Sequence, residues 1–185
     1  MDSRDPFALL GLARRYDLDS AELERRYRDL QRALHPDRHT QSPAAERRMN
    51  LQKAVEVNEA YRTLRDPQRR AEALLAALSG EAKTSAGPSE PADPELLMEM
   101  MELREALSEA KAARDAAQVA KLAERVTAEQ AGVRARLTRE FATLAGGASP
   151  ASEAALTPVR ALVHRLKYYQ RFLDEVAVFE DEALS

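Results

Sequence analysis

Residues 23–37 read LERRYRDLQRALHPD, and the fold can be worked out from this segment. Apolar side chains recur in it at helical spacings of four, three and four, at Leu23, Tyr27, Leu30 and Leu34. This spacing places them on one stripe of an amphipathic helix. Pro36 ends the helix, because proline has no backbone N–H and disfavours the α conformation in the residue before it.

The opposite face of this helix carries three arginines, at Arg25, Arg28 and Arg32. A charged stripe of this kind is typical of any solvated helix face. It is also a surface that an acidic partner protein can bind. The spacing alone does not decide between these two interpretations.

Further helices are predicted on both sides of the segment. A short one follows Asp5 as N-cap with Pro6 at its first position. Asp19 caps the arginine-bearing helix, and another helix is expected from about Ser42 to Leu64, with these residues buried: Leu51, Ala54, Val57, Tyr61 and Leu64. A shorter helix is predicted over 68–78. The two long helices, joined by a short proline-containing loop, form an antiparallel hairpin.

A stretch poor in large apolar residues divides the chain. Residues 80–94 contain three prolines and two glycines, which is typical of a linker. We therefore predict a first domain over 1–79, a linker over 80–94 and a second domain over 95–185.

The second domain is predicted to be an antiparallel bundle of three helices. Asp93 and Pro94 begin its first helix, which has a stripe to bury: Leu96, Met100, Leu103 and Leu107. A second apolar group, Leu97, Met98 and Met101, points elsewhere, with Glu102 and Glu105 near it. Burial between neighbouring helices and exposure as a partner-binding patch both fit this pattern. An alternative role for the Ala-rich stretch 106–123 is a coiled-coil arm, although its heptads are not sustained.

Composition restricts the class of protein. The predicted fold is all α, because no stretch alternates apolar and polar residues as a strand does. There is no cysteine that could ligate an iron–sulfur cluster. No apolar run is long enough for a signal sequence or a membrane helix. The net charge of −3 disfavours nucleic-acid binding. His35, Asp37 and His39 form only a weak pattern for a metal or catalytic site.

The first domain resembles a J-domain, the module by which DnaJ-type co-chaperones engage seventy-kilodalton heat-shock ATPases. The resemblance covers residues 5–75 and rests on Tyr27-Arg28, on His35-Pro36-Asp37 and on the stretch from Asn58 to Pro67. It implies that the loop and the arginine face dock on the ATPase and accelerate ATP hydrolysis. The chaperone-binding residues it implies are His35, Pro36, Asp37, Arg25, Arg28 and Arg32.

Both domains together resemble the HscB family, the J-type co-chaperones of bacterial iron–sulfur cluster assembly. This resemblance rests on two stretches, from Asp66 to Leu75 and from Leu97 to Leu107. The resemblance implies that the bundle binds an IscU-like scaffold protein through six residues: Leu97, Met98, Met101, Glu102, Glu105 and Tyr168. It also implies an HscA-like ATPase as the second partner.

We expect a cytoplasmic monomer that is a co-chaperone and not an enzyme, with no cofactor, no bound metal, no nucleic-acid partner and no membrane partner. The alternatives are a J-domain adaptor for a different client, a helical nucleic-acid-binding protein using the arginine stripe, and an enzyme. Binding that falls steeply with salt would indicate the second, and turnover without a chaperone would indicate the third.

Overall fold

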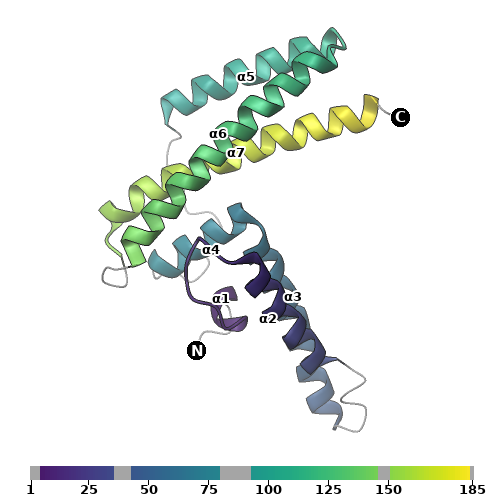
Figure 1. The fold of residues 1–185 in the computed structure, drawn as a ribbon, viewed down its shortest axis with the longest axis vertical. Helices are drawn as coiled ribbons and strands as arrows, with labels where there is room; N and C mark the ends of the chain where they lie inside the picture. Colours follow the sequence, from purple (N-terminus) through teal and green to yellow (C-terminus); the bar gives the residue numbers. More distant parts are fainter. Residues whose placement is uncertain (1–4, 36–42, 80–92, 146–150, 184–185) are drawn as a thin grey trace. The chain divides into compact units, whose positions relative to one another are not determined.

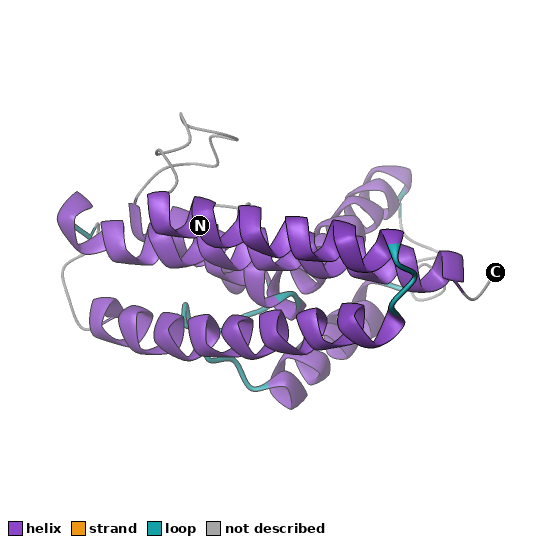
Figure 2. Cartoon of the chain, turned by 90° about the horizontal axis from the view of Figure 1, so that it is seen from above, coloured by secondary structure: helices purple, strands orange, loops and turns teal. Residues whose placement is uncertain are grey.

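The computed structural model describes residues 5–35, 43–79, 93–145 and 151–183, and the regular structure within these ranges is entirely helical (Figures 1 and 2). The all-α prediction is therefore confirmed. The chain forms two compact units: Met1–Ala82 with Phe141–Ala151, and Lys83–Glu140 with Ser152–Ser185. Most of the predicted linker, and the loop residues Pro36, Asp37 and His39, lie outside the described residues.

The first unit contains α1 (Pro6–Leu9), α2 (Ser20–Leu34), α3 (Ala44–Arg65) and α4 (Pro67–Ser79). Both predicted N-caps are present: the side chain of Asp5 accepts a hydrogen bond from the Phe7 amide, and that of Asp19 accepts one from the Ala21 amide. α2 ends where Pro36 requires it to end, since His35 has an extended backbone with ψ 131°.

The core of this unit lies where α1 and α2 pack on the second half of α3 (Figure 1). Its most buried side chains include Phe7, Leu10, Leu23, Val57, Leu64 and Leu74. Leu51 was predicted to be buried, but this is wrong, because 61% of it is exposed. The predicted buried positions are mostly three residues apart, which is less than one helical turn of 3.6 residues, so their directions drift around the helix. Leu51 therefore projects about 140° away from Leu64.

Arg70 links the C-terminal end of α3 to the segment before α2 that contains Tyr16. Its guanidinium donates hydrogen bonds to the carbonyls of Leu64 at 2.8 Å and Tyr16 at 2.9 Å, and it lies 5.6 Å from the Tyr16 ring centroid. Arg70 is therefore a structural residue that satisfies carbonyls at a helix end.

The second unit is built from α5 (Pro94–Ala112), α7 (Glu153–Ala183) and α6 (Ala116–Ala145) as far as Glu140; the last turn of α6, from Phe141, belongs to the first unit. Asp93 caps α5, and the turn after α5 has Arg114 at φ 52° and an Asp115 carboxylate that accepts from the Gln118 amide. Helical stripes of all three helices are buried, including Leu107, Val126, Leu137, Val159, Tyr169 and Phe172. Among the described helices, none combines the length and the apolarity that crossing a membrane requires.

Candidate functional site: two helix surfaces

The arginine face of α2 is exposed to solvent. The side chains of Arg25, Arg28 and Arg32 are 64%, 68% and 73% exposed. Each is paired with an acidic side chain of the same helix, at 3.7 Å for Glu22, 3.0 Å for Glu24 and 2.6 Å for Asp29. Such exposed pairs contribute little to stability, so carboxylates of a partner can replace them at little cost.

Aromatic and polar contacts fix the rotation of α2 against α3. The rings of Tyr27 and Tyr61 stack with centroids 4.0 Å apart, and the Tyr27 hydroxyl donates to Asn58 at 2.9 Å. Gln31 also donates to Asn58. Because these contacts all lie on the α3 side of α2, the arginines are held on the opposite, outward side.

Glu24 connects this interface to the arginine face. Its carboxylate accepts a hydrogen bond from the Tyr61 hydroxyl and pairs with Arg28. The Tyr61 hydrogen bond, followed by that of Arg28, lowers the pKa of Glu24 below its ordinary value, and the same bond to Glu24 raises the pKa of Tyr61.

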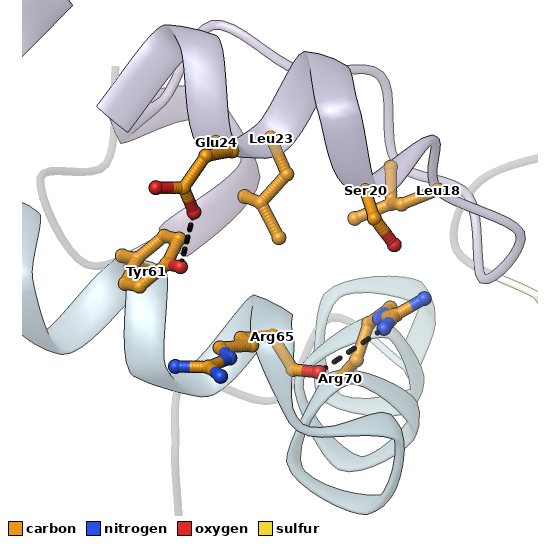
Figure 3. Close-up of a pocket in the computed structure, with 7 residues that line it drawn as sticks. All are labelled: Leu18, Ser20, Leu23, Glu24, Tyr61, Arg65 and Arg70. Atoms are coloured by element: carbon orange, nitrogen blue, oxygen red, sulfur yellow. Dashed lines mark hydrogen bonds between the residues drawn. The ribbon is translucent and has the colours of Figure 1, made fainter. Parts of the chain in front are cut away.

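A pocket of about 470 Å³ opens beside this contact, as Figure 3 shows. Its lining residues come from the turn before α2, from the start of α2 and from α3 and α4: Leu18, Ser20, Leu23, Glu24, Tyr61, Arg65 and Arg70. The walls of this pocket are already engaged in structural hydrogen bonds, as Figure 3 shows for Glu24 with Tyr61 and for Arg70 with the Arg65 carbonyl. We assign it no ligand.

The loop after α2 is described only at its first residue. His35 is exposed and follows the last turn of α2. Pro36 and Asp37, the other predicted loop residues, lie outside the described residues, so their roles stay predictions. Within the described ranges, no cluster of three His, Cys, Asp or Glu side chains is placed to hold a metal ion.

The second surface lies on α5, on the side away from its buried stripe. Leu97, Met98 and Met101 are 43%, 65% and 72% exposed. Glu102 and Glu105 are exposed as well. The other face of the same helix is buried, with Leu96 at 2% and Leu107 at 0%. The sequence left burial and exposure of this group open, and in the structure the group is exposed. We call these three residues, Leu97, Met98 and Met101, the α5 patch.

The aromatic residue predicted for this surface is placed on α7. Tyr168 is half-buried. Its neighbour Tyr169 is fully buried, and its hydroxyl donates to Glu99 of α5 at 2.8 Å. Burial, and then the hydrogen bond to Glu99, raise the pKa of Tyr169 to about 12. Sequence reasoning missed this contact, because the two residues are 70 positions apart in sequence and no local pattern indicates that their side chains meet.

A second missed feature is polar. Gln130 of α6 is 5% exposed, donates to Gln170 of α7 at 3.1 Å and accepts from Arg134 at 2.6 Å. Both the nitrogen and the oxygen of the Gln130 side-chain amide are therefore hydrogen-bonded inside the bundle. In the sequence, Gln130 continues an apolar stripe at helical spacing after Val126, which is the one signal that it is buried.

Comparisons with known proteins match both units. Residues 5–73 match the family model of the DnaJ domain, and residues 92–177 match that of the HSCB C-terminal oligomerisation domain. A co-chaperone HscB homologue of Bordetella pertussis is 41% identical over 138 residues, which cover 75% of this chain and 78% of the relative. A Shewanella homologue is 34% identical over 183 residues, covering 96% and 98%.

Solved structures with a similar fold are known. The chaperone HscB from Vibrio cholerae matches with a TM-score of 0.77 and 34% identity, over 96% of this chain and 98% of the other. Human co-chaperone HscB matches with a TM-score of 0.81, over 97% and 84%; at 24% identity this supports the fold alone.

The first unit, with its DnaJ match, and the three-helix second unit define a J-domain protein with a C-terminal helical bundle. The chain belongs to the HscB family of J-domain co-chaperones of iron–sulfur cluster assembly. The resemblance inferred from the sequence is thus confirmed, whereas the expected monomer and the individual site residues stay predictions.

Proposed function

We propose that this chain is a cytoplasmic co-chaperone that binds an iron–sulfur scaffold protein and delivers it to a specialised heat-shock-type ATPase. It stimulates that ATPase and thereby promotes cluster transfer to acceptor proteins. The observation that carries the proposal is the α5 patch, since three large apolar side chains stand exposed on a helix whose opposite face is core.

The ATPase is proposed to bind the arginine face of α2 together with the loop that begins at His35. Guanidinium groups offer planar, charge-assisted donors to carboxylates. Their present partners, Glu22, Glu24 and Asp29, are solvent-exposed acids of the same helix, so exchange for a partner's carboxylates keeps every arginine paired. This supports a docking surface whose affinity for the ATPase rises with electrostatic complementarity and falls with added salt.

The scaffold protein is proposed to bind the α5 patch. Methionine side chains are flexible and polarizable, so they adapt to a partner's apolar surface. Glu102 and Glu105 are exposed on the same helix. A matching partner surface therefore presents an apolar centre with basic residues beside it.

Two separate binding surfaces on one chain allow coupling. An adaptor of this kind brings scaffold and ATPase together, and hydrolysis then traps the scaffold if the ATPase binds it more tightly in one nucleotide state. The chain itself supplies no catalytic step in this scheme, since it accelerates the hydrolysis carried out by its partner.

The test is a single-turnover ATPase assay with the purified specialised ATPase, with this chain alone, with the scaffold alone and with both. We expect stimulation by the chain and a further increase with scaffold. His35→Gln or Asp37→Asn should abolish the stimulation while helicity is kept, and His164→Gln on α7 is the matched control. Retained stimulation in the loop variants would contradict the assignment of the loop.

A chain that stimulates the ATPase but does not bind the scaffold would instead be a J-domain adaptor for a different client. The α5 patch would then be the surface with which to search for that client.

A further inference from the structure

A polar cluster joins the beginning of α5 to the middle of α7. Glu99 accepts the hydrogen bond of the buried Tyr169 at 2.8 Å and lies 3.7 Å from Arg165. Arg165 also lies 3.5 Å from Asp93, the N-cap of α5. One arginine and one tyrosine of α7 thus hold two acids of α5, one at its cap and one in its second turn.

The same part of α5 carries the α5 patch. The helix begins at Pro94, so Leu97 and Met98 are its fourth and fifth residues and Met101 is its eighth. The ends of a helix fray more readily than its middle, and the amides before Leu97 have no intrahelical partner. A binding surface in this position needs something that keeps it helical and correctly rotated.

Apolar packing alone does not fix that rotation. Leu96 and Met100 bury the inner face of these turns, but such contacts are non-directional. Hydrogen bonds are directional, and an ion pair keeps its two charged groups close together. Glu99 is flanked in sequence by Met98 and Met100, so its attachment to α7 sets which side of α5 faces outward.

We propose that Glu99, Arg165 and Tyr169 are positioning residues of the scaffold-binding surface, which hold the first two turns of α5 in the binding-competent helix. The inference rests on the proposed function, because it concerns the surface assigned there to the scaffold. The raised pKa of Tyr169, about 12, is consistent with it, since the phenol stays a neutral donor to Glu99 across the physiological range.

The chain offers a matched control at the other end of the same helix pair. Lys111 of α5 forms an ion pair with Glu175 of α7 at 3.1 Å. Lys111 is twelve residues beyond Glu99, about 18 Å along the helix at 1.5 Å per residue. Loss of this pair removes an α5–α7 contact of similar kind without touching the turns that carry the α5 patch.

The experiment is calorimetric titration with metal-free scaffold protein, combined with hydrogen exchange of the free chain. We expect Tyr169→Phe and Glu99→Leu each to raise Kd about fivefold to tenfold, because affinity falls with the fraction of competent helix. Glu99→Gln, which still accepts from Tyr169, should recover most of the affinity. Lys111→Met should bind like the wild type.

Hydrogen exchange separates positioning from general destabilisation. In Tyr169→Phe and Glu99→Leu, amides of residues 97–101 should exchange faster, while those of 104–112 keep their wild-type rates. Arg165→Gln, at a partly exposed position, gives a second variant in case the change at the buried Tyr169 disturbs the bundle.

Wild-type affinity and wild-type exchange in these variants would overturn the inference, as would equal losses in Lys111→Met. These outcomes are distinct from failure of the proposed function. That failure would appear as absence of scaffold binding by the wild-type chain itself, whatever the exchange data show.

Discussion

The ring of Tyr27 on α2 stacks on the ring of Tyr61 on α3, with centroids 4.0 Å apart and an angle of 14° between the planes. The Tyr61 hydroxyl then reaches Glu24, which also pairs with Arg28. A single interface residue therefore connects the packing of the helix hairpin to the arginine face. Stacked rings and satisfied hydroxyls hold that face outward.

Tyr61→Phe should keep the ring stack and remove the donor to Glu24. The pKa of the Glu24 carboxyl should rise toward its ordinary value, because the hydrogen bond from Tyr61, the largest cause of the lowered pKa, is lost. A carboxylate with a depressed folded pKa stabilises the fold above its unfolded pKa, and this contribution is lost as pH falls through the folded pKa. Wild type should thus exceed the variant in stability at neutral pH and lose this advantage in acid. An NMR titration in which Glu24 behaves identically in both proteins would contradict this.

Tyr169 should make the stability of the fold sensitive to alkali. Its folded pKa is raised to about 12, so its contribution is complete below the unfolded pKa of about 10 and is lost as pH rises through the folded value. Unfolding experiments across this range should show a loss of stability that is smaller in Tyr169→Phe. Equal pH dependence in both proteins would show that the buried hydroxyl is not the cause.

Leu107→Ala and Met101→Ala should differ sharply in stability, although both lie on α5. Leu107 is fully buried, so its truncation should destabilise the protein by about 2–5 kcal/mol. Met101 is 72% exposed, so its truncation should change stability by less than about 0.5 kcal/mol. Denaturant unfolding measures both. A large loss for Met101→Ala would show that this side chain is part of the core and not of a binding surface.

Arg28→Glu combined with Arg32→Glu should weaken binding to the ATPase by roughly tenfold or more, because two donors become repulsive to an acidic partner. The wild-type interaction should also weaken with added salt. The control is Arg125→Glu on α6, an exposed arginine of the other unit. Equal affinity of the double variant and the control would exclude the arginine face from the docking surface.

The sequence predicts the helices of this chain well because their ends are set locally. Asp19, Pro36 and Asp93 each act on neighbouring residues, and the stripe from Leu96 to Leu107 requires only the helical period. Leu51 shows the limit of this reasoning, since a run of three-residue steps places it away from the core it was assigned to.

Features that depend on a neighbouring helix could not be predicted. Periodicity shows that Met98 and Met101 lie off the buried stripe of α5, but whether another helix covers them depends on the tertiary arrangement. The contact between Glu99 and Tyr169 likewise has no local signal. The J-domain and scaffold-binding assignments came from the family resemblance and not from helical periodicity.

The most direct test of the account is calorimetric titration of this chain with the purified scaffold protein, beside the variant Leu97→Ala with Met101→Ala. The matched control is Val178→Ala, a similarly exposed apolar residue on α7. We predict saturable binding by the wild type and the control, and loss of binding in the double variant with its fold intact. Absence of binding by the wild type to a folded scaffold, or full binding by the double variant, would contradict the account.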